Sequence, residues 1–308
     1  MYTVWRGAAG LVGLGAGVLA WSTVVEPRAF ALREFEVPVL PSGAAPLRVL
    51  HLSDLHLVPG QRAKADWVRS LAALEPDLVV TTGDNLAHQD AVPAVLDAYR
   101  DLLEIPGVFV LGSNDYYAPF PKNPFRYFGD SHGTGAGTVR YELPTAELVA
   151  GFRSAGWLDL TNARGRLEVA GLSLEFVGVD DPHLGLDRYD EVAGPASPGT
   201  DLFVGVTHAP YLRVLDAMTA DDAGLVLAGH THGGQVCVPF YGALVTNCDL
   251  GTDRVKGLSR WWPGADNAPS AQAPAGASWL EVSAGLGASP YSPFRLACRP
   301  EATLLTLV

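Results

Sequence analysis

Acidic, imidazole and amide side chains are concentrated in five short segments of this sequence. In chain order the segments are Ser53-Asp54-Leu55-His56, Gly83-Asp84-Asn85, Gly112-Ser113-Asn114-Asp115, Thr207-His208 and Gly229-His230-Thr231-His232-Gly233-Gly234-Gln235. Imidazole and carboxylate groups are good ligands for zinc, iron and manganese ions, and no thiolate joins the set. The residue types therefore predict a site for divalent metal ions.

The spacing inside these segments suits a pair of metal ions. Asp54 and His56 are two residues apart, so both can point the same way from an extended turn, and His230 and His232 repeat this spacing. A carboxylate such as Asp84 can bridge two cations that lie about 3.5–4 Å apart. A water molecule between such cations has its pKa lowered from about 15.7 towards about 7. The resulting hydroxide is a nucleophile that requires no serine or cysteine.

Each of the five segments follows a short apolar run that is typical of a β-strand. The predicted strands are residues 47–52, 78–82, 108–111, 202–206 and 225–228. Apolar residues at helical spacing predict helices between strands, at residues 62–74, 92–103, 145–155 and 210–219. This alternation indicates the α/β class with a largely parallel sheet. Ligands bind at the carboxyl ends of strands in open α/β sheets, where all five segments would meet.

The remaining segments complete the predicted domain. Residues 167–179 alternate between apolar and polar side chains as strands do, and residues 280–283 and 302–308 are predicted to close the chain as strands. Residues 116–143 are rich in proline, glycine and aromatic residues, which predicts a long surface loop that could bind substrate. We therefore expect one catalytic domain over residues 47–308.

The N-terminal segment predicts a membrane partner. Residues 7–25 carry no charge and are about long enough to cross a bilayer as a helix. We expect residues 1–29 to form an uncleaved single-pass anchor, with a cleaved signal peptide or a buried helix as the alternatives. Residues 30–46 contain three prolines and are expected to form a linker or an edge strand. An anchor or a signal peptide would both place the catalytic domain outside the cytoplasm.

The overall charge argues against one class of partner. The net charge is −12, so no basic stripe is available to displace counterions from nucleic acid. Nucleic-acid binding is therefore not expected, whereas a phosphate substrate remains compatible because bound metal ions would supply local positive charge. The sequence does not indicate an oligomeric state.

The order and spacing of the five segments resemble the calcineurin-like metallophosphoesterase family, over residues 47–308. The Gly-His-Thr-His-Gly-Gly-Gln segment is similar to the membrane-associated bacterial phosphodiesterase branch. The resemblance implies a four-layer α/β/β/α sandwich and two divalent metal ions (manganese, iron or zinc). It implies that Asp54, His56 and His232 bind one metal, that His208 and His230 bind the other, and that Asp84 bridges the two.

The third segment departs from the family pattern. The family usually has Gly-Asn-His-Asp or Gly-Asn-His-Glu there, with the asparagine on the second metal and the histidine as proton donor. A gapless match puts Ser113 at the metal position, whereas a one-residue shift would bring Asn114 to it. We expect Asn114 to be the ligand because an amide oxygen is the better donor to a cation. The usual proton donor is missing, so His88, His183 or a metal-bound water are the candidates to replace it.

The resemblance implies a dinuclear phosphoester hydrolase, in particular a phosphodiesterase, that uses a metal-bridging hydroxide. Asp84, Asn114 and His88 are its predicted catalytic residues. The alternative is a module that kept the fold and metal binding but lost turnover, as the altered third segment would allow. A membrane anchor favours a lipid-linked or envelope phosphate as substrate, although the motifs do not choose among phosphoesters.

Overall fold

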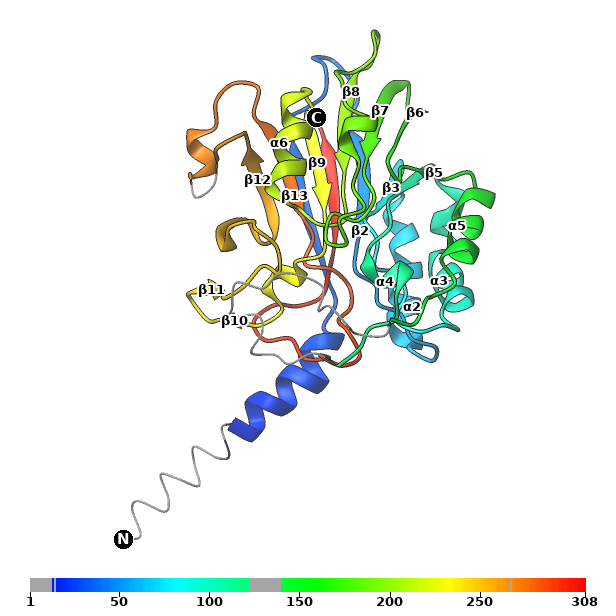
Figure 1. Cartoon of the computed structure of the whole chain (residues 1–308), viewed down its shortest axis with the longest axis vertical. Helices are drawn as coiled ribbons and strands as arrows, with labels where there is room; N and C mark the ends of the chain where they lie inside the picture. The colour runs from blue at the N-terminus through cyan, green and yellow to red at the C-terminus, as the bar shows by residue number, and fades with distance from the viewer. Residues whose placement is uncertain (1–12, 14, 122–139, 266–267) are drawn as a thin grey trace.

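The structure is a computed structural model that describes residues 13, 15–121, 140–265 and 268–308. Two six-stranded sheets form its centre (Figure 1). Both sheets contain parallel and antiparallel pairs, so the predicted α/β class is confirmed in the form of two mixed sheets.

The first sheet carries the first three site segments. Its strands, in spatial order, are β1 (Ala31–Val37), β14 (Glu301–Leu307), β2 (Leu47–Leu52), β3 (Leu78–Thr81), β4 (Gly107–Phe109) and β5 (Leu158–Asp159). Strands β2 to β5 are parallel, β14 is antiparallel to β2, and β1 runs parallel to β14 at the edge. The parallel order puts the carboxyl ends of β2, β3 and β4 side by side.

The second sheet carries the two histidine segments. Its strands, in spatial order, are β12 (Gly257–Trp261), β13 (Ser278–Val282), β9 (Leu225–Ala228), β8 (Leu202–Val206), β7 (Leu172–Gly178) and β6 (Ala163–Val169). Strands β13, β9, β8 and β7 are parallel, and antiparallel strands flank them on both sides. The carboxyl ends of β8 and β9 are therefore neighbours.

The two sheets pack against each other through one apolar core. Side chains from both sheets meet in it, including Val49 and Val80 of the first sheet and Phe176, Val204 and Leu227 of the second. A second core covers the outer face of the first sheet beneath helices α2 (Arg62–Ser70), α3 (Val92–Tyr99) and α5 (Thr145–Ser154). A third lies between the second sheet and helix α6 (Leu212–Ala220). Because both faces of each sheet are covered, β3 and β9 consist entirely of buried residues.

The structure also contains elements that the sequence pattern did not predict. These are β12, the hairpin of β10 (Cys237–Val238) and β11 (Gly242–Ala243), and the short helix α4 (Ser113–Tyr116). Of the predicted loop 116–143, residues 122–139 lie outside the described part of the chain.

Residues 15–20 are helical, and a π-helix at Trp21–Val25 and a 3₁₀ turn at Glu26–Arg28 follow. Within the described residues, no helix combines the length and the hydropathy needed to span a membrane. Residues 1–12 and 14 of the predicted anchor lie outside that part of the chain.

Phe176 is fully buried between the sheets, so Phe176→Ala removes a large side chain from the core that holds the two halves together. We expect the free energy of unfolding to fall by about 3–5 kcal/mol, because a cavity adds to the lost burial. Urea unfolding followed by circular dichroism measures the change. The exposed Leu186→Ala is the matched control, and a loss below about 1 kcal/mol in Phe176→Ala would contradict the shared core.

Candidate metal centre

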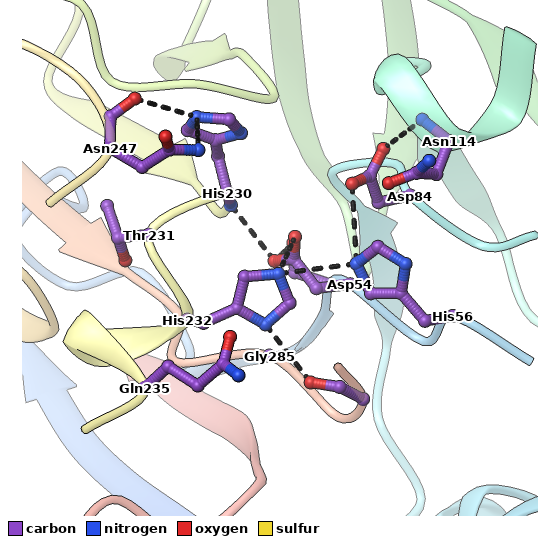
Figure 2. Close-up of polar contacts among 12 residues, drawn as sticks. Asp54, His56, Asp84, Asn114, His230, Thr231, His232, Gln235, Asn247 and Gly285 are labelled. Carbon is purple, nitrogen blue, oxygen red and sulfur yellow. Dashed lines mark hydrogen bonds and ion pairs between the residues drawn. The ribbon is translucent and has the colours of Figure 1, made fainter. Parts of the chain in front are cut away.

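The site lies where the carboxyl ends of strands from the two sheets meet. Asp54 and His56 follow β2, Asp84 follows β3, His208 follows β8, and His230 and His232 follow β9. Figure 2 shows Asp54, His56, Asp84 and His232 pointing towards one another. The structure therefore brings together residues that are up to 178 positions apart in the chain, as the sequence pattern predicted for this edge.

Two groups of side chains are each close enough to hold a metal ion. Asp54, His56 and His232 form one group, and Asp54, Asp84 and His208 form the other, with ligand atoms within 4.8 Å of one another in each. In the first group His56 Nε2 lies 3.2 Å from His232 Nε2, and His232 Nε2 lies 3.6 Å from Asp54 Oδ1. This arrangement is consistent with a dinuclear metal centre.

Asp84 lies between the two halves of the cluster. Its Oδ2 is 3.4 Å from His56 Nε2, and its Oδ1 is 3.6 Å from His208 Nε2. His230 adjoins the second half, since its Nδ1 lies 3.2 Å from His208 Nε2. One carboxylate oxygen therefore faces each half, which is the geometry that a bridging carboxylate requires.

Five of the seven predicted ligands have a left-handed backbone. The φ angles are 51° at Asp54, 41° at His56, 56° at Asp84, 68° at His230 and 50° at His232. Aspartate and histidine tolerate this conformation better than most residues, but it is strained and persists only where the surroundings fix it. The tight turns aim the side chains back over the strand ends.

Hydrogen bonds fix which ring nitrogen of His208 and of His232 faces the centre. His208 contacts Thr82 O through Nδ1 at 2.7 Å, and His232 contacts Gly287 O through Nδ1 at 3.0 Å. The Nε2 atom of each ring is then left facing the cluster. Such contacts orient metal-binding histidines and set their tautomer.

Asp54 is held by a chain of buried hydrogen bonds that connects the sheets. Its Oδ2 accepts from Ser53 Oγ at 2.6 Å, and Ser53 Oγ accepts from Thr82 Oγ1 at 2.7 Å. Thr82 contacts His51 Nε2 at 2.9 Å, and His51 Nδ1 contacts Glu281 of β13. His51 is fully buried within β2 and supports the site through these contacts.

Arg295 holds the loop that follows β13. Its guanidinium donates to Ala284 O at 2.8 Å and to Gly287 O at 2.5 Å, which is the carbonyl that His232 also contacts. The backbone N–H of Arg295 donates to Ser22 O at 2.8 Å, and Cys298 N–H donates to a carboxylate oxygen of the buried Glu26 at 2.5 Å. The end of the N-terminal helix is thereby tied to the surroundings of His232.

The third segment forms a regular turn. Helix α4 begins at Ser113, and Asp115 accepts backbone N–H groups from Asp84 at 2.9 Å, Asn85 at 2.8 Å and Gly112 at 3.0 Å. No extra residue separates Gly112 from Asp115, so the turn contains no bulge that would produce the one-residue shift.

Asn114 reaches the cluster mainly through its backbone. Its N–H donates to Asp84 Oδ1 at 2.6 Å (Figure 2). Its side-chain NH₂ group donates to Tyr117 O at 2.9 Å. Asn114 lines the cavity, but its role as a metal ligand stays a prediction.

Burial and mutual repulsion keep protons off most of the histidines. Burial and neighbouring His232 hold the pKa of His56 well below its usual value, and burial lowers the pKa of His232 to about 4. Burial and the nearby His183 likewise depress the pKa of His230. Neutral imidazole is the form that binds metal ions.

The carboxylates show the complementary effect. Burial raises the pKa of Asp84 to about 8, with Asp54 adding to the shift and His208 opposing it. Burial alone would lower the pKa of His208, but Asp84 and Asp181 raise it to about 9. Burial therefore disfavours the ionised carboxylate of Asp84, and a bound cation would oppose this effect by stabilising the negative charge.

The donor set fits divalent metal ions. Asp54 Oδ1 and His56 Nδ1 are buried without a hydrogen-bond partner among the described residues, and the cluster offers only oxygen and nitrogen donors. A buried polar atom without a partner is costly, and a bound cation would remove that cost at Asp54 Oδ1. These ligand types suit manganese, iron and zinc alike.

A cavity of about 390 Å³ opens over the cluster. Its walls combine ligand residues with aromatic and aliphatic side chains, among them His56, Asp84, His230, His232, Tyr117, Phe120, Leu184, Leu244, Tyr291 and Phe294. Arg140 also lines it, with its guanidinium 5.1 Å from the Tyr117 ring centroid. A phosphate group bound at the cluster would have apolar surface beside it for the rest of a substrate.

The two histidines considered as proton donors lie in different places. His183 lines the cavity, and its ring centroid is 4.5 Å from that of His230. The structure does not bring His88 to the cluster, because this residue is exposed on the surface with its ring 3.7 Å from the Asp90 carboxylate. The distance from the cavity follows from the turn after Asp84, which directs residues 88–90 towards solvent.

The model of the calcineurin-like phosphoesterase family matches residues 47–234, more than half of the chain. The chain belongs to the calcineurin-like phosphoesterase family. It is therefore a metal-dependent phosphoesterase, and the predicted hydrolase class is confirmed.

Two similar proteins align with nearly the whole chain. The uncharacterized metallophosphoesterase YkuE of Bacillus subtilis is 28% identical over 97% of this chain and 93% of its own length. Phosphodiesterase YaeI of Escherichia coli is 28% identical over 92% of this chain and 90% of its own length. The solved structure of TT1561 from Thermus thermophilus has a TM-score of 0.39 at 12% identity, over 79% of this chain and 91% of that one, which is too low for an inference.

Sequence reasoning missed several residues around the phosphoesterase centre. The supporting role of Asp115 and the buried position of Asp181 could have been suspected, since both lie in segments of polar residues after predicted strands. Lys64 and Arg295 gave no such signal. Each is a single basic residue in an ordinary segment, yet both are buried beside the cluster.

Lys64 makes the stability of the phosphoesterase depend on pH. Its Nζ donates to Leu55 O at 2.8 Å, and burial lowers its pKa from 10.5 to about 7. Between these values the unfolded chain holds the proton that the folded chain has lost, so stability should rise with pH from about 7 to about 10.5. Lys64→Met should remove this rise.

Urea unfolding at several pH values, compared between the wild type and Lys64→Met, isolates the contribution of Lys64. Arg62 is an exposed basic residue on the same helix, so Arg62→Met is a suitable control. Parallel pH profiles for the wild type and Lys64→Met would contradict the assignment.

Proposed function

We propose that this phosphoesterase is a phosphodiesterase that uses two divalent cations and acts on an amphipathic, lipid-linked or envelope phosphoester. The observation that carries the dinuclear part is the position of Asp84, whose two oxygens face His56 on one side and His208 on the other. We assign one cation to Asp54, His56 and His232, the other to His208 and His230, and Asp84 to both.

Bound cations at this centre would withdraw charge from the phosphoryl oxygens and increase the acidity of a coordinated water. The chain supplies the positioning. Thr82 O and Gly287 O orient the rings of His208 and His232, and Asp115 holds the turns on which Asp84 and Asn114 lie. Arg140 is placed to meet a phosphoryl oxygen at the cavity wall.

His183 supplies the proton that the leaving oxygen requires. It lines the cavity beside His230, and Tyr211 Oη lies 3.1 Å from its Nδ1, so its ring is held in place while it borders the substrate space. His88, which was the alternative, faces solvent. Asn114 occupies the position of the proton donor in the gapless family match, and there its amide is suited to hydrogen bonding with a bound phosphate.

The surface around the cavity supports an amphipathic substrate and a membrane location. Large apolar side chains are exposed on the end of the N-terminal helix, on and just after the β10–β11 hairpin, and on the loop that follows β13. They are Val18, Leu19, Trp21, Val24, Val25, Val238, Phe240, Tyr241, Leu244 and Tyr291. Hydrogen bonds from Arg295 N to Ser22 O and from Cys237 N to Leu296 O place these elements next to each other (Figure 1).

Leu244 and Tyr291 belong both to this apolar surface and to the cavity wall. A phosphoester carried by an apolar chain could therefore pass from a bilayer into the cavity without crossing water. Exposed apolar side chains on neighbouring elements are typical of a membrane or partner contact. Together with the uncharged segment 7–25, it supports a single-pass membrane protein with the catalytic domain outside the cytoplasm.

Asp84→Ala tests the dinuclear assignment. Loss of the shared carboxylate should lower the metal content below one ion per chain and reduce turnover of bis-p-nitrophenyl phosphate by at least about 10³-fold, since transition-state charge is no longer stabilised. Metal analysis and a colorimetric assay after reconstitution with Mn²⁺ or Zn²⁺ measure both effects. The exposed Asp90→Ala serves as control, and wild-type turnover in folded Asp84→Ala would refute the proposal.

His183→Gln tests the proton donor by comparing leaving groups. Hydrolysis of a diester with an alkyl alcohol leaving group should fall by about 10²–10⁴-fold, because a poor leaving group needs the proton. The p-nitrophenyl diester should change much less, because its leaving group departs without help. His88→Gln is the matched control and should affect neither substrate. An equal loss on both substrates in His183→Gln would show a structural role instead.

A further inference from the structure

Ser113 and Asp181 form a buried pair at the edge of the cluster. Ser113 Oγ donates to Asp181 Oδ2 at 2.5 Å, and the other carboxylate oxygen accepts the backbone N–H of His183 at 2.8 Å. Asp181 is fully buried, whereas Ser113 lines the cavity. The carboxylate is thereby fixed in one orientation, directly behind the serine hydroxyl.

The pair lies on the side of the second metal position. A Cβ atom placed on Gly112, the neighbour of Ser113, would come within 2.4 Å of Asp84 Oδ1 and 2.6 Å of His208 Cε1. On the other side of the pair, the ring of His183 packs at 4.5 Å from that of His230. Gly112 and His183, which lie close to the two members of the pair in the chain, therefore pack against Asp84, His208 and His230, the residues that we assign to the second cation.

The charge of Asp181 is offset only in part, by the nearby ring of His208. Among the described residues no lysine or arginine forms an ion pair with this carboxylate, whose donors are one hydroxyl and one backbone N–H. A buried charge with so little compensation costs several kcal/mol unless a cation is nearby. In contrast, the adjacent Asp180 faces Tyr116 Oη at 2.7 Å and is only half-buried.

The family position for an amide ligand falls on Ser113, because the turn from Gly112 to Asp115 has no extra residue. The serine side chain is shorter than the asparagine side chain. Like the amide, it carries no charge of its own. Asp181 lies behind Ser113 and accepts its hydroxyl hydrogen, so the serine oxygen has its lone pairs left for a cation.

We propose that the Ser113–Asp181 pair takes the place of the missing asparagine, and that it supplies the oxygen donors and the negative charge for the cation held by Asp84, His208 and His230. The proposal rests on the dinuclear function given above. It assigns Asn114 to the cavity wall, where it faces substrate. It also makes the second metal position one charge more negative than an asparagine ligand would. Carboxylate and hydroxyl oxygens favour hard ions such as Mn²⁺ at this position.

Asp181→Asn tests the proposal through metal binding, without reference to activity. Full-length protein in detergent is stripped with a chelator and titrated with Mn²⁺, followed by metal analysis and electron paramagnetic resonance. The wild type should bind about two ions per chain with a spin-coupled signal. Asp181→Asn should bind the second ion about 10–100-fold more weakly and give the six-line signal of isolated Mn²⁺.

Two controls distinguish the pair from its neighbours. Asp180→Asn changes the adjacent carboxylate, which faces Tyr116, and should keep both ions. Asn114→Ala should also keep both ions. In the double variant Ser113→Asn with Asp181→Asn, the family amide is restored, and we expect it to recover the second ion at least in part.

Each outcome decides the question. The proposal would be overturned if Asp181→Asn bound the second ion as tightly as the wild type. It would also be overturned if Asn114→Ala alone lost the second ion. If Asp181→Asn fails to fold by circular dichroism, Ser113→Ala decides instead, since it should weaken the second ion about tenfold and unchanged affinity would reject the pair. Fewer than two ions in the wild type would reject the dinuclear function itself, which separates the two failures.

Discussion

The burial of several carboxyl groups in one cluster is the constraint on which this structure depends. Asp54, Asp84 and Asp181 are all almost completely inaccessible to solvent, and they lie around imidazole rings that burial keeps neutral, apart from His208. Such an arrangement is unfavourable unless cations occupy it. The fold must therefore hold mutually repelling groups in place before the cations bind, and much of the surrounding architecture serves this purpose.

Backbone and side-chain hydrogen bonds provide that support. Asp115 gathers the N–H groups of the second and third site turns on one carboxylate, and the chain from Asp54 through Ser53, Thr82 and His51 reaches Glu281 in the other sheet. Neither sheet could shift against the other without disturbing this chain. Strained backbone at five predicted ligands is tolerated because these contacts and the packed core between the sheets fix the turns.

The elements that were predicted correctly from sequence are those whose burial imposes a strong pattern. Strands β2, β3, β8 and β9 are covered on both faces, so their residues form short aliphatic runs, and the polar segments after them identified the site edge. The strand β12 and the β10–β11 hairpin were missed. Both are partly exposed and contain glycine, which gives no clear alternation.

The details of the centre depended on geometry that one sequence does not contain. Whether Ser113 or Asn114 adjoins the second metal position depends on the shape of one turn, and left-handed backbone at aspartate or histidine has no reliable signature. The position of Asp181 next to Ser113 follows from two segments 68 residues apart that only the folded chain brings together. Likewise, the burial of Lys64 and Arg295 results from tertiary packing and not from local pattern.

The contacts between the N-terminal helix and the loop around Arg295 make the two ends of the chain interdependent. Ser22 and Glu26 accept hydrogen bonds from residues 295 and 298, and Arg295 in turn holds the carbonyl that orients His232. A shortened protein that starts after residue 26 loses these attachments. Its metal centre would be less well ordered than that of the intact chain. Kinetic constants measured on such a fragment would therefore underestimate the activity of the intact enzyme.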